Sequence, residues 1–356
     1  MTIFNYEKII YKMSKNKKIN IKGLAQKLGL SVSSVSRALN GYDNISQQTK
    51  DKIFKTAKKY NYFPDLNAKR LASKKTDTIA FISAIHPDAP DHVVLQFLAG
   101  ITLGIKNTNT ELITKFCLNE EEEMNYFKKL ISTEQADKFI FYRIKKNDER
   151  VNFLNERGIK FVTWGRTNKQ KEHAWIDLDN RKSIEILINK LSNNGHERIA
   201  FINVHRSFNY GAQRKRAYEN LINKLKLKFS KEYYQDSLIE TVESGSAMAS
   251  YLLSLKKPPT AIICSHLRFF TGCLLKCQDL KLEIGKDISV VGFNDQDSFL
   301  SSQNLTFISH PLMEMGKHSV KILQDLDKGV PINKVSTLIE PILNEGTSDK
   351  IKKPKL

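Results

Sequence analysis

The sequence predicts an α/β protein in which a small three-helix head and a hinge helix precede a two-lobed domain of doubly wound parallel sheets. Two short helical patterns joined by a glycine turn lie at residues 21–40, and apolar runs alternate with amphipathic stretches from Thr78 onward. The 356 residues also exceed one ordinary domain. We therefore expect a basic arm at 1–18, a helix-turn-helix domain at 19–63, a hinge helix or linker at 64–76, a two-lobed domain at 77–345 and a disordered tail at 346–356.

The composition disfavours an exported, membrane-bound or cofactor-dependent protein. No apolar run of membrane-spanning length occurs, and residues 1–18 alternate lysine with apolar residues in place of a signal core. The four cysteines form no CxxC pair, and a reducing cytosol would keep them as thiols. We expect a cytoplasmic, nucleoid-associated protein with no membrane contact, no metal and no cofactor.

Positive charge is concentrated near the N-terminus. The formal net charge is +19, and residues 1–76 hold 17 Lys or Arg against 4 Asp or Glu, so this fifth of the chain contributes +13. A basic head favours a polyanionic partner such as a nucleic acid. The alternative is that the lysines only form solvated basic faces. This alternative is sufficient to explain the smaller excess of positive charge in the rest of the chain.

The head has the pattern of a helix-turn-helix. Asn20 can cap a helix over 21–28, and Gly29 can end it because glycine enters the left-handed region without strain. Ser31 can cap a second helix over 32–40, and a third would run from Ser46 to about residue 60. The second helix keeps polar residues outward, which suits a major groove; they are Ser33, Ser34, Ser36, Arg37 and Asn40.

Four motifs in register resemble the DNA-binding head of the LacI/GalR family of bacterial transcription regulators: VSRALN at 35–40, SQQTKDKI at 46–53, YFP at 62–64 and AKRL at 68–71. The resemblance implies that Val32 and Ser33 choose bases. It implies phosphate contacts from Ser31, Ser46 and Thr49. The full set of expected DNA-contacting residues in the three helices and their caps is Asn20, Ser31, Val32, Ser33, Ser36, Arg37, Asn40, Ser46 and Thr49.

The same resemblance implies a hinge helix at residues 65–73. In the family it folds when two subunits lay it together into the minor groove of the operator. Leu71 would then be a wedge between base steps, with Ala68 and Lys69 in the same motif. A buried linker residue is the alternative for Leu71. The chain departs from the family at Asp65, where Asn is usual, and at Lys69, where Arg is usual.

Strand-like and helical patterns then alternate in two series, which predict two lobes of similar plan. The first series has strands at 78–85, 111–118, 137–144 and 160–165, with helices near 93–106, 120–131 and 148–157. The second begins with a helix near 180–194 and has strands at 198–203, 260–265 and 288–293, with helices near 210–225, 243–255, 268–279 and 312–327.

Lobes of this kind bind ligands in the crevice at the carboxyl ends of their strands. In this chain those ends carry polar and aromatic side chains, which suit a hydroxyl-rich ligand. A solvated loop rim would have a similar composition. The resemblance continues through DLDN at 177–180, GHERIAFI at 195–202 and ISVVGFND at 288–295, and it implies a periplasmic-binding-protein-like domain and a homodimer.

Carried over by position, the expected effector-binding residues are Trp164, Asp179, Arg214, His266, Phe293 and Asn294. Asn294 stands where many members have Asp, and Ser265-His266 stands where an Asn-Asp or Ser-Asp pair is common. A loop imidazole bonded to backbone is the alternative for His266. We do not count His196, in the Gly-His turn, as a site residue.

These features predict a sequence-specific regulator, a repressor, of a carbohydrate uptake or catabolism operon. Its expected partners are double-stranded operator DNA, a sugar-like effector and a second copy of the chain. A purine or nucleoside effector is the alternative, although the Asp, Arg and Asn set favours polyols. A solute-binding protein of transport would need no basic head. An enzyme is disfavoured because GxxxxGK[ST], GxGxxG, HExxH and GxSxG motifs are missing.

Overall fold

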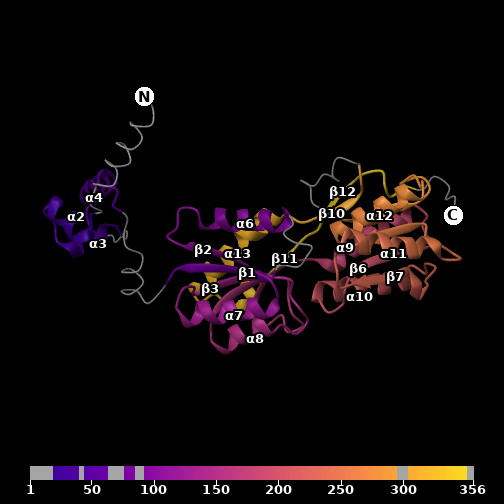
Figure 1. Ribbon diagram of the computed structural model, residues 1–356, viewed down its shortest axis with the longest axis horizontal. Helices are drawn as coiled ribbons and strands as arrows, with labels where there is room; N and C mark the ends of the chain where they lie inside the picture. Colours follow the sequence, from indigo (N-terminus) through magenta and orange to yellow (C-terminus); the bar gives the residue numbers. More distant parts are fainter. Residues whose placement is uncertain (1–18, 40–43, 63–75, 85–91, 295–303, 351–356) are drawn as a thin grey trace, which may run out of the picture. The chain divides into compact units, whose positions relative to one another are not determined.

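The computed structural model describes residues 19–39, 44–62, 76–84, 92–294 and 304–350 (Figure 1). The chain divides into two compact units, Met1–Thr76 and Asp77–Leu356. Asn40, Ala68, Lys69 and Leu71 lie outside the described residues. Within the described residues, no helix is both long and apolar enough to cross a membrane.

The N-terminal unit contains the predicted three helices: α2 (Ile21–Leu28), α3 (Val32–Leu39) and α4 (Gln47–Lys59). The Asn20 side chain accepts a hydrogen bond from the Gly23 amide, and Gly29 ends α2 with φ +67°. Leu24, Val35 and Ile53, one from each helix, are fully buried. The small core therefore leaves the polar side of α3 in solvent, which confirms the expected helix-turn-helix head.

The C-terminal unit contains two six-stranded sheets, which define its two lobes. The first lobe has the strand order β11-β5-β4-β3-β1-β2, and every pair in it is parallel. Its strands are β1 (Thr78–Ala84), β2 (Glu111–Cys117), β3 (Lys138–Tyr142), β4 (Lys160–Trp164), β5 (Ala174–Leu178) and β11 (Thr337–Ile339).

The second lobe has the order β12-β10-β9-β8-β6-β7, and only β12 runs antiparallel. Its strands are β6 (Ile199–Val204), β7 (Tyr234–Ser237), β8 (Ala261–Cys264), β9 (Ser289–Phe293), β10 (Phe307–Ser309) and β12 (Ile342–Asn344). The predicted class of two doubly wound, mainly parallel sheets is therefore confirmed.

Helices cover both faces of each sheet, and apolar clusters fill the space between them. In the first lobe, α6 (His92–Ile105) and α13 (Leu312–Asp327) cover one face, and α7 (Glu120–Ser132) and α8 (Glu149–Glu156) the other (Figure 1). In the second lobe, α9 (Asn180–Asn193) and α10 (Asn209–Lys224) lie opposite α11 (Val242–Ser254) and α12 (Leu267–Asp279). A short helix, α14 (Ile332–Val335), follows α13.

Two expectations are wrong. We assigned the helix near 312–327 to the second lobe because it follows that lobe's strands in sequence, but α13 packs on α6, β4 and β5 of the first lobe. We also expected a disordered tail from residue 346, yet Asp349 is buried and accepts hydrogen bonds from Thr306 (2.6 Å) and Asn194 (2.8 Å). These two bonds fix the chain against the second lobe as far as Lys350.

Glycines allow α6 and α13 to approach until their backbones touch. A Cβ atom added at Gly100 would clash with the Met313 carbonyl, and one added at Gly316 would clash with the Phe97 carbonyl. Neither neighbour is the end of a flexible side chain, so the helices would have to separate to accommodate it.

We therefore expect Gly100→Ala to lower the free energy of unfolding by about 2 kcal/mol or more, because overpacking forces backbone shifts. Urea denaturation of both proteins measures the difference. Thr102→Ala is the matched control: it places alanine at an exposed position of the same helix and should change stability by less than about 0.5 kcal/mol. Equal stability of Gly100→Ala and wild type would contradict the packing argument.

Candidate functional site

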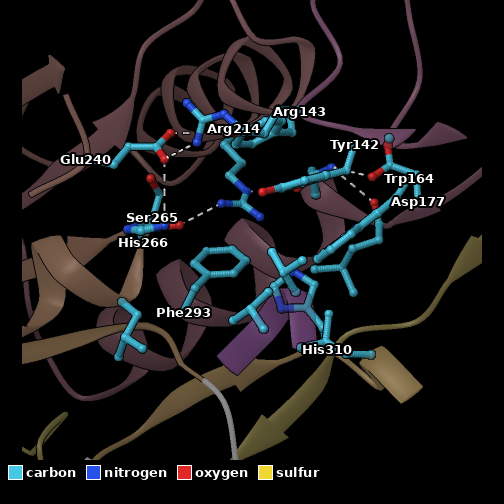
Figure 2. A pocket seen from close by; sticks show the side chains of 18 of the residues that line it. Tyr142, Arg143, Trp164, Asp177, Arg214, Glu240, Ser265, His266, Phe293 and His310 are labelled. Atoms are coloured by element: carbon cyan, nitrogen blue, oxygen red, sulfur yellow. Dashed lines mark hydrogen bonds and ion pairs between the residues drawn. The ribbon is translucent and has the colours of Figure 1, made fainter. Parts of the chain in front are cut away.

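A cavity of ≈ 170 Å³ lies where the carboxyl ends of the strands of the two lobes face each other (Figure 2). Its walls come from both lobes: Tyr142 and Trp164 end β3 and β4 of the first, and Phe293 ends β9 of the second. The structure brings five of the six predicted effector residues to this cavity, namely Trp164, Arg214, His266, Phe293 and Asn294.

Asp179 does not line the cavity. Its side chain caps α9 by accepting a hydrogen bond from the Lys182 amide at 2.9 Å. Asp177, two residues earlier at the end of β5, lines the cavity together with Asn180. The DLDN motif thus supplies two cavity residues, but the carboxylate among them is Asp177.

Arg214 reaches into the cavity from α10 and is 5% exposed. Its Nε donates to Asn180 Oδ1 at 2.8 Å, and its Nη1 donates to the Ser265 carbonyl at 2.7 Å. The guanidinium carbon lies 3.8 Å from the centre of the Phe293 ring, a cation–π contact. Burial lowers the pKa of Arg214 to about 10, against the raising effects of Tyr210, Asp177 and Glu240.

Asp177 forms an ion pair with Arg166, whose Nε lies 2.9 Å from Oδ2. The carboxylate is almost completely buried. Burial raises the pKa of Asp177 to about 6, although Arg166 and Arg214 act in the opposite direction. The site therefore holds a carboxylate that changes its charge close to neutral pH.

An ionic contact joins the two lobes beside the cavity. Arg143, which follows β3 in the first lobe, donates from Nη1 to Glu240 Oε2 at 2.5 Å, and Glu240 precedes α11 in the second lobe. Tyr210 donates to the other oxygen at 3.3 Å, and His266 Nε2 lies 3.8 Å from Oε2. Burial would raise the pKa of Glu240, but His266 and Arg143 outweigh it and lower that pKa.

The aromatic residues of the cavity are already engaged with protein groups. The Trp164 ring stacks on Phe97 and Tyr142 with centroid distances of 4.7 and 5.5 Å. Phe293 carries the Arg214 guanidinium. Both rings therefore already have stacking partners within the protein, and the cavity also offers charged and polar groups to a ligand.

Sequence reasoning missed several cavity residues: Tyr142, Arg143, Asp177, Tyr210, Glu240 and His310. Arg143 could have been found, since it lies next to the carboxyl end of the strand predicted over 137–144. Glu240 carries no such signal because the strand before it, β7, was not predicted. His310 follows the short strand β10, which was also missed; burial, Arg214 and His266 lower its pKa to about 3.

In the head, the residues expected to meet DNA lie on or beside α3. Ser33 and Arg37 are exposed, and Val32 is 40% exposed. Ser31 caps α3, since its Oγ accepts from the Ser34 amide at 3.1 Å, and Ser46 caps α4 by accepting from the Thr49 amide at 3.4 Å. Ser36, on the same helix, is partly buried.

Two protein-family models match the chain. The model for bacterial regulatory proteins of the lacI family covers residues 20–65, and the periplasmic binding protein-like domain covers residues 188–348. The chain thus combines a DNA-binding head of the lacI type with a periplasmic-binding-protein-like domain. It is a DNA-binding transcriptional regulator. The first match contains the three helices of the head, and the second contains every strand of the second lobe's sheet.

Relatives of full length agree with this assignment. The HTH-type transcriptional regulator RegA of Clostridium saccharobutylicum is 27% identical over 339 residues, which are 92% of this chain and 98% of RegA. Two solved structures share the fold at 19% identity. The lac repressor dimer bound to operator and the anti-inducer ONPF has a TM-score of 0.79 and covers 94% of this chain and 100% of its own. The complex of the regulator CelR with cellobiose has a TM-score of 0.67, with 93% and 100% covered.

The raised pKa of Asp177 makes a prediction for stability. The folded-state pKa of about 6 lies above the ordinary value of 3.8, so folding favours the protonated acid. This stabilisation is complete below about pH 4 and is lost as the pH rises through 6. The stability of wild type relative to Asp177→Asn should therefore fall between pH 4 and 7, by up to roughly 3 kcal/mol. Urea unfolding at several pH values tests this. Parallel pH profiles of the two proteins would show that Asp177 titrates normally.

Proposed function

We propose that the protein is a homodimeric repressor of a carbohydrate uptake or catabolism operon, and that a sugar-like effector in the cavity changes its affinity for operator DNA. The observation that carries the proposal is the set of charged and polar side chains in the cavity wall, to which both lobes contribute. Such groups can bind several hydroxyls of one small polyol. The structure of CelR, which shares this fold, is a complex with cellobiose, and it supports a sugar effector.

A purine or nucleoside effector has less support. It would need an aromatic face for stacking, and both Trp164 and Phe293 are already stacked on protein groups. The purine alternative therefore ranks below the sugar in this proposal.

The control would work by linkage between two binding equilibria. An effector that contacts Arg143 in the first lobe and Arg214 in the second binds best to one arrangement of the lobes, and it therefore shifts the population towards that arrangement. If operator binding favours the same or the opposite arrangement, a coupling of about 1–3 kcal/mol changes operator affinity roughly 5- to 150-fold. By the same linkage, operator DNA changes effector affinity by the same factor.

The DNA contacts belong to α3 and its surroundings. Val32, Ser33 and Arg37 face solvent, as base-contacting side chains of a recognition helix must. We propose that supporting contacts to bases or phosphates come from Asn20, Ser31, Ser36, Ser46 and Thr49. The proposed hinge contacts of Ala68, Lys69 and Leu71, and that of Asn40, lie outside the described residues.

Arg37→Ala should weaken operator binding by about 1–3 kcal/mol and relax specificity at one base pair, because a bidentate arginine–guanine contact is lost. Binding to operator and to random duplex, measured at one salt concentration, separates the two effects. Lys55→Ala on α4 also removes an exposed cation and is the matched control, which should keep the sequence preference. Equal losses on both DNAs for Arg37→Ala would exclude a reading role.

The effector is tested by selecting binding sites from random duplex DNA at about 150 mM salt, with and without a panel of sugars, sugar acids and nucleobases. We expect a pseudo-palindromic site whose occupancy changes with a sugar-type compound. Selection of a palindrome that responds only to a nucleobase would replace the sugar by the purine alternative. Recovery of no preferred sequence would refute a sequence-specific repressor.

A further inference from the structure

Three guanidinium groups lie in or beside the cavity, and two of them are neutralised. Arg143 is paired with Glu240, and Arg166 is paired with Asp177. Arg214 differs, because its two hydrogen bonds go to neutral acceptors, the Asn180 side chain and the Ser265 carbonyl. Among the residues that the structure describes, no carboxylate forms an ion pair with Arg214.

An unpaired buried cation is costly, because its charge is removed from water without a counterion. Arg214 is 5% exposed, and its Nη2 makes no hydrogen bond to the described part of the chain. Figure 2 shows the guanidinium directed into the cavity between Phe293 and the groups of the first lobe. The positive charge is also felt nearby: besides burial, Arg214 and His266 hold the pKa of His310 low.

One of the polar residues that line the cavity together with Arg214 is an amide. Asn294 follows β9 and lines the same cavity. An aspartate at this position would supply one negative charge to the cavity. Among the described residues, with Asn294 as an amide, the cavity and its immediate partners hold three guanidinium groups and two carboxylates, Asp177 and Glu240.

We propose that the effector itself supplies the missing charge, and that it is a sugar acid, a polyol with one carboxylate that pairs with Arg214. This inference rests on the proposed function, since it specifies the effector of the same cavity. The planar fork of an arginine matches a carboxylate, and one negative charge would balance the charge of Arg214. A phosphate brings nearly two charges close to Asp177 and Glu240, so a sugar phosphate fits less well.

The first test is direct binding of small sugars to the full chain. The probes are gluconate, glucuronate and galacturonate, their neutral parents glucose and galactose, and glucose 6-phosphate. Titration calorimetry gives each affinity, and the fluorescence of Trp164 in the cavity wall gives a second reading. We expect at least one sugar acid to bind roughly tenfold or more tightly than its neutral parent, as a hydrogen bond to a charged group implies.

The decisive variant is Asn294→Asp, which adds the missing carboxylate with almost no change of shape. It should reverse the preference, weakening the sugar acid roughly tenfold or more relative to its neutral parent. Asp179→Asn is the matched control, since it exchanges the same two residue types at the cap of α9, outside the cavity. It should leave the ratio of acid to neutral affinity unchanged. Because the readout is a ratio within one protein, a general loss of stability does not imitate it.

The outcomes separate the two proposals. Neutral sugars that bind as tightly as the acids would overturn the sugar-acid inference and leave a sugar-responsive regulator in place. Tighter binding of glucose 6-phosphate than of every sugar acid would also overturn it, in favour of a phosphorylated effector. An unchanged preference in Asn294→Asp would show that Arg214 does not select the charge. Failure of all the probes to bind would overturn both the sugar effector and its charge.

Discussion

The contact between Arg143 and Glu240 is the interaction on which the sensor site depends, because it ties the two lobes together at the cavity. Glu240 is buried and Arg143 is mostly buried, and the two residues come from different lobes. Separating the lobes would leave two charges without their partner, which is costly until water reaches them. A change in the arrangement of the lobes therefore also changes the balance of charge in the cavity.

A second buried arginine holds the first lobe's half of this contact in place. Arg150 of α8 pairs with Glu123 and Asp148 and donates to the carbonyls of Tyr142 and Arg143. These bonds fix the backbone directly after β3, where Arg143 has φ +59°. A non-glycine residue is uncommon in that region, so the surrounding bonds must hold it there. The turn directs the Arg143 side chain across to Glu240 in place of continuing the strand.

The sequence revealed the fold well where the signal is local. Caps and apolar periodicity located the helices within a few residues, and long buried strands such as β1 and β6 were evident as apolar runs. The strands that were missed are short: β10, β11 and β12 have three residues each, and β7 has four. The helix α13 was also assigned to the wrong lobe. The chain crosses from one lobe to the other before this helix, and the sequence of the helix does not show that crossover.

The residues of the cavity likewise divide into those that a local sequence pattern indicates and those that it does not. Arg214 and Phe293 could be expected at the cavity from strand ends and family motifs. Asp179 was expected there in place of Asp177 because the DLDN motif offers two acidic residues, and the sequence does not say which one the helix cap uses. The roles of Glu240 and Tyr210 arise only when the two lobes face each other, so no local pattern could show them.

Effector selectivity in this cavity is therefore better argued from charge balance than from the shape of individual residues. The polar groups contributed by Asp177, Asn180 and Asn294 suit hydroxyls in general and discriminate weakly among polyols. A buried charge discriminates strongly, since a ligand that leaves it unpaired forfeits far more free energy than one hydroxyl contributes. On the proposed assignment, the amide of Asn294 in the cavity of Arg214 sets what the cavity selects without involving the Arg143–Glu240 contact or the DNA-binding head.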